Sequence, residues 1–292
     1  MDEVIITKPS PERILKAIDD SDIASIGSVI SGIMRVINDP RSTAKDLREI
    51  IELDPPLTAK ILRFTNSAYY APKQPIEEID KAIVWLGFEV LREIALSQKA
   101  SQVFDQANET PGFSGKDLWK HSVAVALFAK YLYRREFGLR GENIYTAGLL
   151  HDIGIIAENQ IIHSDFVRVQ QQVQEFAKSL DEVETQLLGF DHAYLGNQIS
   201  RHWNLPEDLQ TVIAFHHHPL NAPAEHQKAV FSLYVADTVI QNNEIGYCDS
   251  PQWDETLYRQ CVDHLRVKDH ALNAIREEVM EEIKKLEGMG LL

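Results

Sequence analysis

Cysteine is nearly absent from this chain: Cys248 and Cys261 are its two cysteines among 292 residues. Two cysteines cannot build a disulfide framework, and their placement does not match the ligand spacing of a zinc knuckle. We therefore expect free thiols in a reducing compartment, which indicates a cytoplasmic protein. Residues 1–6 lack the basic and long apolar parts of a secretory signal, in agreement with that location. No stretch approaches the roughly 18 uninterrupted apolar residues of a transmembrane helix, so no membrane partner is expected.

Basic residues are also scarce. The chain has 29 Lys and Arg against 44 Asp and Glu, which gives a net charge of −15 and a pI near 5.2. A protein that grips a nucleic-acid backbone needs clustered Lys and Arg, so no nucleic-acid partner is expected. The same acidity repels free phosphate substrates unless a cation lies in the site. The hydrophobic content of 44% is normal for a globular protein with a sizeable core.

Strand-like alternation of apolar and polar residues never persists for more than a few positions. Apolar residues instead recur at i, i+3, i+4 and i+7, the spacing of amphipathic helices. We therefore predict an all-α protein. The predicted helices cover residues 14–37, a segment that begins near 44, and residues 57–66, 79–86, 90–96, 118–137, 142–150, 164–187, 192–203, 206–217, 225–242 and 268–285.

A domain boundary is predicted near residues 108–114, where turn-forming residues interrupt the helical pattern. Ser114 and Asp117 then resemble a capping box that opens the next helix. Ser42 and Thr43 are candidate caps for the helix that begins near Ala44. We predict two parts, an N-terminal helical subdomain of residues 1–110 and a C-terminal helical subdomain of residues 111–292.

Metal-capable side chains are present in a distinctive order in the second part. Oxygen and nitrogen donors of this kind bind hard or borderline divalent metals, which activate water for attack on phosphate esters. An apolar run that ends at Leu150 buries its segment and then presents two adjacent candidate ligands. The seven candidates are His121, His151, Asp152, His192, His216, His217 and Asp237.

Each of these residues also has a simpler interpretation. His121 alone could be a hydrogen-bonded helix residue, and His216 and His217 could lie at a solvated helix end. Asp237 is harder to explain in this way, because it lies inside an apolar run and a buried carboxylate needs a partner. Asp152 is the natural bridge between two metals, since a carboxylate offers two oxygens while an imidazole offers one nitrogen at a time.

The candidate ligands resemble those of the HD phosphohydrolase superfamily, and the paired histidines resemble the second-metal ligands of its HD-GYP branch. The surrounding sequence is more similar to the HDOD family, the HD-related output domain. This resemblance spans residues 10 to 285. It is carried by residues 54–63, 66–70, 82–87, 119–122, 147–154, 191–196 and 203–206.

The resemblance implies an HD-domain-like helical bundle preceded by a helical N-terminal subdomain, in a bacterial signalling protein. It also implies one metal held by His121, His151, Asp152 and Asp237, and a second held by Asp152, His192, His216 and His217. The two ions would be divalent transition metals, namely Fe, Mn, Zn or Ni, and His151 and Asp152 would be the catalytic residues.

The chain departs from HD-GYP at two places. Ile155 stands where that branch carries a lysine, and the Gly-Tyr-Pro element after the paired histidines is replaced by a segment that begins at His218. Both departures argue against cyclic di-GMP as the substrate, because a positive contact to the substrate phosphate is missing.

Two functions of different class remain open. The first is a metal-dependent phosphohydrolase acting on a nucleotide or another phosphoester, with activity falling below about pH 6 as the ligand histidines protonate. No residue is evident as its general acid; Glu158 and His218 are the nearest candidates, and each could instead be a surface residue or one that supports a metal ligand. The second is a non-catalytic signalling scaffold with a structural or vestigial metal, whose partners are signalling proteins or a small phosphorylated ligand. Residues 66–70, with two tyrosines, are then either a packed helix end or a ligand contact.

Overall fold

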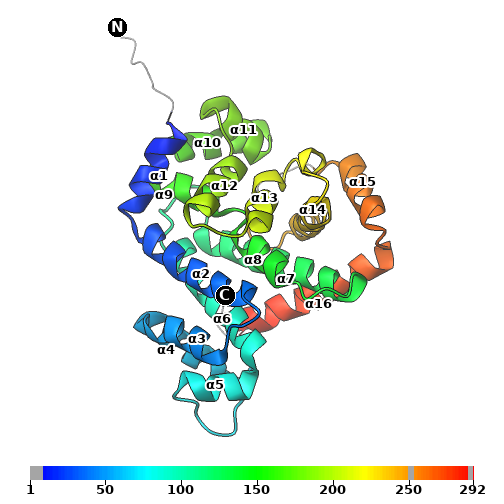
Figure 1. Cartoon of the computed structure of the whole chain (residues 1–292). Helices are drawn as coiled ribbons and strands as arrows, with labels where there is room; N and C mark the ends of the chain where they lie inside the picture. The colour runs from blue at the N-terminus through cyan, green and yellow to red at the C-terminus, as the bar shows by residue number, and fades with distance from the viewer. Residues whose placement is uncertain (1–8, 249–252, 289–291) are drawn as a thin grey trace.

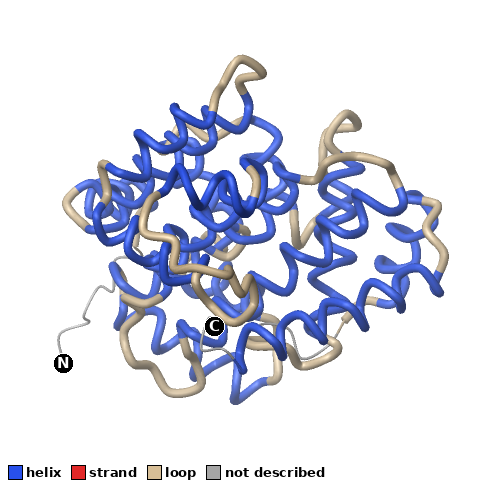
Figure 2. The backbone as a smooth tube through the Cα atoms, turned by 90° about the horizontal axis from the view of Figure 1, so that it is seen from below, coloured by secondary structure: helices blue, strands red, loops and turns tan. Residues whose placement is uncertain are grey.

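The computed structural model describes residues 9–248, 253–288 and 292; residues 1–6, where no secretory signal is expected, lie outside this range. The described residues form helices joined by loops, and their one β contact is the isolated bridge between Thr110 and Phe113 (Figure 2). The prediction of an all-α protein is confirmed. In chain order the elements are α1 (Pro11–Asp19), α2 (Asp22–Asn38), α3 (Ala44–Glu52), α4 (Pro55–Thr65), α5 (Ile79–Leu86), α6 (Phe88–Phe104), α7 (Gly115–Glu136), α8 (Glu142–Leu150), α9 (Ile153–Ile161), α10 (His163–Phe176), α11 (Leu180–Leu187), α12 (His192–His202), α13 (Glu207–Phe215), the 3₁₀-helix η1 (Pro219–Asn221), α14 (Gln227–Gln241), α15 (Glu255–Leu265) and α16 (Asp269–Gly288).

The apolar face predicted over the first forty residues belongs to two helices rather than one. Ser21 separates α1 from α2, because its hydroxyl donates to the carbonyl of Ile18 and accepts from the amide of Ile23. A serine that caps one helix and closes the preceding one turns the chain without exposing the apolar residues on either side. Both helices bury their isoleucines, and α1 reaches α9 and α12 while α2 packs along α6.

Side-chain caps define the next helices. Asp46 accepts from both the backbone amide and the hydroxyl of Thr43, which makes Thr43 the cap of α3. Asp54 caps α4 by accepting from the amide of Leu57 at 3.0 Å. Its other oxygen accepts from Lys99 on α6 at 2.6 Å, so one carboxylate both starts α4 and ties it to α6. This pair is largely buried.

Helix α7 is the central element of the second half (Figure 1). It contacts α8, α14, α16 and α6, and most of its length is buried on every side. Ser114 accepts from the amide of Asp117, as predicted for the start of this helix. The 22-residue length of α7 lets one rigid element carry groups that face the metal candidates and groups that face the N-terminal half.

One predicted helix is divided in the structure, and the neighbouring helix α9 was not predicted. The helix predicted over residues 164–187 is divided into α10 and α11, with Ala177 in the left-handed region at φ +48°. The break changes the direction of the chain, so Phe166 on α10 and Val183 on α11 are both fully buried. Helix α9 was not predicted, because it is buried on nearly all sides and lacks an amphipathic period.

The C-terminal region contains a helix, α15, that the spacing of the apolar residues did not predict. Asp254 caps α15 by accepting from the amide of Leu257 at 3.0 Å, and Cys261 lies fully buried in the same helix. Cys248 is exposed, and neither cysteine forms a disulfide. Helix α16 matches the predicted closing helix and runs along α7 (Figure 1). None of the described helices is both long and apolar enough to cross a membrane.

The buried apolar residues form one continuous cluster that extends from Ile14 in α1 to Ile283 in α16. Helices α6, α7 and α8 contact one another and thereby join the two halves. The division into residues 1–110 and 111–292 stays a prediction. What matters for function is that α7, α8, α9, α12, α13 and α14 converge on one buried point.

Candidate metal centre

The end of α8 places His151 and Asp152 at the centre of the second half. Leu149 and Leu150 are fully buried, and this apolar turn holds the chain in the core up to the point where the two polar residues follow. Gly154 then allows α9 to approach α12 closely. A Cβ atom built on Gly154 would lie 2.0 Å from the carbonyl oxygen of His192, which is a backbone atom that cannot give way easily.

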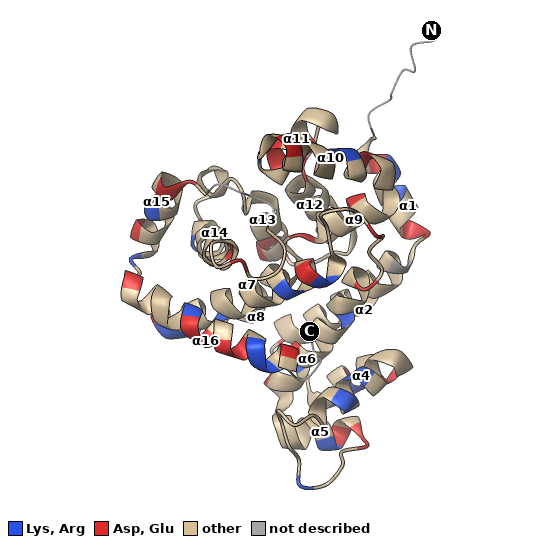
Figure 3. Cartoon of the chain, turned by 180° about the vertical axis from the view of Figure 1, so that it is seen from behind, with Lys and Arg blue, Asp and Glu red and all other residues tan. Residues whose placement is uncertain are grey.

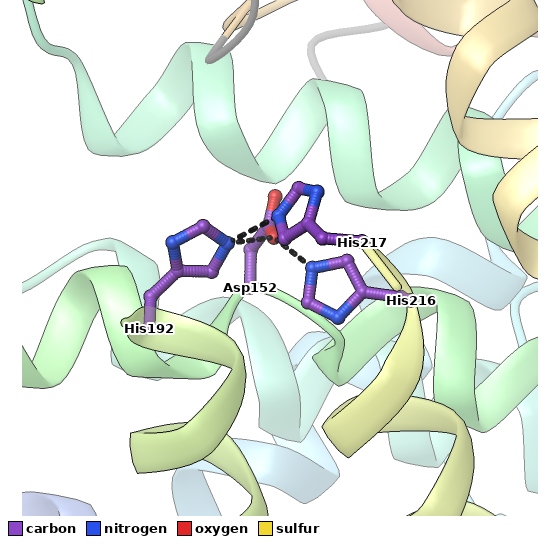
Figure 4. A group of neighbouring side chains, drawn as sticks. All are labelled: Asp152, His192, His216 and His217. Carbon is purple, nitrogen blue, oxygen red and sulfur yellow. Dashed lines mark hydrogen bonds and ion pairs between the residues drawn. The ribbon is translucent and has the colours of Figure 1, made fainter. Parts of the chain in front are cut away.

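Asp152 lies between two groups of histidines and offers one carboxylate oxygen to each. Its Oδ2 lies 3.1 Å from His151 Nε2 and 3.8 Å from His121 Nε2. Its Oδ1 lies 3.6 Å from both His192 Nε2 and His216 Nε2 (Figure 4). The side chain is 2% exposed. A carboxylate that bridges two metal ions needs one oxygen directed toward each ligand group, and Asp152 has this orientation.

The first group contains His121, His151 and Asp152, whose donor atoms lie within 4.8 Å of one another. Asp237 is not part of this tight set, but its Oδ1 lies 3.0 Å from His121 Nε2. Gln241, one turn further along α14, donates to both oxygens of Asp237 at 3.1 and 3.2 Å and orients the carboxylate. The structure thus brings all four residues predicted for the first metal to one place.

The second group contains Asp152, His192, His216 and His217, again with donor atoms within 4.8 Å of one another. His192 begins α12, and His216 and His217 directly follow the last residue of α13, so the ends of two helices position all three imidazoles. Figure 4 shows the three rings around the carboxylate of Asp152. The Nε2 atoms of His192 and His217 are 2.7 Å apart, a spacing at which one nitrogen donates to the other.

The donor set fits a divalent metal, because buried donor atoms at its centre lack a hydrogen-bond partner among the described residues. His151 donates from Nδ1 to the carbonyl of Gly148 at 2.8 Å, and His216 donates from Nδ1 to the carbonyl of Ile213 at 2.7 Å. Nε2 of His216 and Oδ1 of Asp152 have no hydrogen-bond partner, while Nε2 of His151 faces Oδ2 of Asp152 at 3.1 Å. A backbone carbonyl on Nδ1 selects the tautomer in which Nε2 is a ligand.

Glu184 is a site residue that the sequence interpretation missed. It is fully buried on α11, and its Oε2 accepts from both the Nδ1 and the backbone amide of His192, at 2.7 and 2.8 Å. A carboxylate behind a metal-binding imidazole fixes its orientation and raises its basicity. The available signal was a glutamate inside an apolar helix face, eight residues before His192 in the chain.

Glu158 is fully buried behind Glu184, which contradicts the suggestion that it acts as a general acid on a substrate. Burial and the neighbouring charge of Glu184 raise the pKa of Glu158 well above its usual value. The raised pKa favours the neutral form of this carboxyl group, which lies inside the core near Glu184. His218, the other candidate, is mostly exposed and lies 3.9 Å from Asp181.

Opposite charges keep the centre ionised in the absence of metal. Burial alone would raise the pKa of Asp152, but His151, His216 and His192 lower it well below the usual value. Asp237 behaves in the same way, since His121 outweighs burial and lowers its pKa to about 2. Burial and the adjacent rings lower the pKa of His217. The aspartates are thus ready to accept cations at neutral pH.

A cavity of about 480 Å³ opens beside the centre and reaches His217 and Asp237. Its outer wall carries Asp181 and Lys178 together with the half-exposed Trp253. Because acidic groups outnumber the single lysine, a phosphate group would be repelled here unless cations were bound at the His/Asp cluster.

Metal affinity should depend strongly on pH through His151. Burial would lower its pKa, but the charge and hydrogen bond of Asp152 outweigh this effect and raise it to about 9 in the metal-free protein. His151 is therefore protonated at pH 7 and must lose its proton to bind a metal. Affinity should rise about tenfold per pH unit between pH 6.5 and 8.5 and level off above about pH 9.

Competition between the protein and a chromophoric chelator for Zn²⁺ measures this slope, and calorimetry in buffers of different ionisation enthalpy counts the protons released. A pH-independent affinity would contradict the assignment of His151 as a ligand. The earlier expectation of a change near pH 6 rested on the ordinary pKa of histidine, which Asp152 raises in this fold.

Comparisons with known proteins agree with this architecture. The family model of the HDOD domain matches residues 23–219, which is more than half of the chain. A protein of Treponema pallidum (strain Nichols), described as uncharacterized, is 24% identical over 249 residues. That match covers 85% of this chain and 47% of the relative, so the chain spans about half the length of the curated protein it matches.

Solved structures show the same fold. An HDOD domain protein of unknown function from Geobacter sulfurreducens has a TM-score of 0.76 at 24% identity, over 88% of this chain and 90% of that one. A candidate phosphohydrolase from Shewanella amazonensis SB2B has a TM-score of 0.68 at 24% identity, over 95% of both chains. A candidate signal transduction protein from Marinobacter aquaeolei VT8 has a TM-score of 0.73 at 17% identity, over 96% of this chain and 68% of that one.

Proposed function

Because this chain belongs to the HDOD family, we propose that it is a bacterial signalling regulator that binds two divalent metal ions and hydrolyses a phosphoester. The observation that carries the proposal is the position of Asp152. Its two oxygens face two separate histidine groups, and the unpaired donor atoms of both groups are buried around it.

The residues divide naturally between the two ions. His121, His151 and Asp237 would hold the first, His192, His216 and His217 the second, and Asp152 both. Two divalent ions in such a centre lower the pKa of a water molecule and neutralise the negative charge of a phosphoryl group. The protein contributes orientation: Gly148 and Ile213 fix two imidazole tautomers, and Glu184 fixes a third.

The cavity beside the centre suggests the class of substrate. Its volume of about 480 Å³ suits a nucleotide-sized phosphoester, with Trp253 and Lys178 available at its outer wall. Ile155 is fully buried, so the position that carries a lysine in HD-GYP proteins offers no cation to this cavity. A phosphoester other than cyclic di-GMP is therefore the favoured substrate.

Turnover is the direct test. Protein loaded with Mn²⁺ or Fe²⁺ should hydrolyse at least one member of a panel of cyclic dinucleotides, nucleoside monophosphates and an aryl phosphodiester. His216→Ala removes a ligand of the second group and should lower the rate at least about 100-fold. His270→Gln changes an exposed histidine of α16 and should leave the rate unchanged.

The second function, a non-catalytic signalling scaffold, is favoured by the acidic wall of the cavity, which disfavours phosphate binding. The panel separates the two functions. Stoichiometric metal with no turnover of any substrate would support a structural metal in a scaffold. Turnover that is lost in His216→Ala but kept in His270→Gln would support the hydrolase. Signalling proteins or a small phosphorylated ligand would be the partners of the scaffold.

A further inference from the structure

A second cavity, of about 270 Å³, lies where the N-terminal half meets the second half and α16. Its lining is unusual in being rich in tyrosine. Tyr69 and Tyr70 follow α4, Tyr131 belongs to α7 and Tyr145 to α8. Tyr145 is 7% exposed at the floor, and Tyr69 is 39% exposed at the mouth. The cavity therefore opens to solvent at one end and closes on aromatic rings at the other.

The rings are held in fixed orientations. Tyr69 and Tyr70 meet edge to face with ring centroids 4.8 Å apart, and Phe64 packs against Tyr70 at 5.6 Å. The ammonium of Lys130 lies 5.3 Å from the centroid of the Tyr145 ring. The floor thus already holds one cation against an aromatic face, the geometry in which a ring quadrupole attracts positive charge.

The charges of the lining are unequal. Glu93 is neutralised by Lys130 and lies 3.3 Å from Arg134. Glu282 on α16 accepts from the hydroxyl of Tyr69 at 2.5 Å, and no basic side chain pairs with it in the described part of the chain. Glu93 is thus balanced by two cations, and Glu282 is the lining carboxylate that has no basic partner among the described residues.

The pKa values of two lining tyrosines are raised by burial and by these carboxylates. Burial raises the pKa of Tyr131 to about 12, and the carboxylates of Glu282, Glu278 and Glu93 add to the rise. Burial and the same two lining carboxylates, Glu93 and Glu282, raise the pKa of Tyr70 as well. Burial, the larger cause, disfavours any charge, but the contribution of the carboxylates marks negative charge nearby, which favours a cation over a neutral molecule in the same space.

We propose that this cavity is a binding site for a small organic cation, with the positive group beside Glu282 and its carbon surface on the tyrosine rings. The volume accommodates a ligand of the size of a quaternary or primary alkylamine. Aromatic faces and a carboxylate without a basic partner are the chemistry that recognises such cations. Tyr69 and Tyr70, from the segment 66–70 whose role the sequence left open, line this site.

The site is separate from the metal centre although both use α7. At about 100° per residue, Lys130 lies about 180° around the helix from His121, so the two sites occupy opposite faces. Helix α16 runs beside α7 and carries both acidic and basic residues there (Figure 3). Loss of metal binding would therefore leave this proposal intact, and the reverse also holds.

Calorimetric titration of the full chain with choline tests the site. The matched neutral probe is 3,3-dimethylbutan-1-ol, which has the same shape and no charge. Choline should bind saturably at one site per chain, at least about tenfold more tightly than the alcohol, because only the cation gains from the rings and Glu282. Equal affinities of the two probes, or no saturable choline binding up to about 10 mM, would overturn the proposal.

Variants locate the binding. Glu282→Gln keeps the hydrogen bond to Tyr69 but removes the charge, and Tyr131→Leu removes a ring; each should weaken choline binding at least about tenfold. Glu281→Gln removes a neighbouring charge on the exposed side of α16 and should change affinity less than twofold. Circular dichroism of each variant checks folding. Choline binding that persists in both cavity variants, or falls equally in Glu281→Gln, would place the cation elsewhere.

Discussion

Replacement of Asp152 with alanine is expected to remove both metal ions at once. Untagged wild-type protein should contain about one to two equivalents of Fe, Mn, Zn or Ni, and the variant should contain almost none. The reason is geometric: Oδ2 faces His121 and His151, and Oδ1 faces His192 and His216. Among the described residues, Asp152 is the side chain that both groups share. Elemental analysis after gel filtration measures the content.

Variants that remove one histidine from one of the two groups show which ion each group holds. His121→Ala should lower the content by the first ion only, and His216→Ala by the second only, since each faces one oxygen of Asp152. Asp208→Ala, an exposed change on α13, is the control and should retain all metal. Full metal content in Asp152→Ala would contradict the bridging role. Loss of both ions in every ligand variant would show that the two positions fill cooperatively.

Lys99→Met is expected to destabilise the fold by about 3–5 kcal/mol, because it leaves the carboxylate of Asp54 buried without its cation. The two side chains are 7% and 13% exposed, and their atoms lie 2.6 Å apart. Urea unfolding measures the loss. The matched control is Lys60→Met, which breaks the exposed pair with Asp105 between the same two helices and should cost about 0–1 kcal/mol.

The same pair predicts an acid-dependent loss of stability. Burial raises the pKa of Asp54, but the hydrogen bonds from Lys99 and Leu57 outweigh it and hold the folded-state pKa below 3.8. Since the folded pKa is lowered, the stabilisation is fully present above the unfolded pKa and is lost as pH falls through the folded value. The double variant Asp54→Asn/Lys99→Met should lack this part of the pH dependence.

In the urea experiment, a loss of stability in Lys60→Met as large as that in Lys99→Met would indicate that burial of the ion pair does not cause the destabilisation.

Local patterns in the sequence predicted much of the secondary structure. The spacing of the apolar residues indicated an all-α chain, and Thr43 and Ser114 identified two helix starts, because capping depends on groups a few residues apart. Local patterns failed where burial is uniform or the helix is short. Helix α9 has no polar face to reveal a period, and the turn at Ala177 depends on how α10 and α11 pack.

The sequence by itself determined which side chains could bind metal, because donor chemistry belongs to residue type and the order of the candidates is readable along the chain. Only the tertiary structure decided that the seven candidates meet, that Asp152 turns one oxygen to each group, and that Glu184 supports His192. It also decided that Glu158 is buried away from any substrate and that four tyrosines from three segments line one cavity. The physical reason is that these relations are distances between residues far apart in sequence, and the packing of the whole core sets such distances.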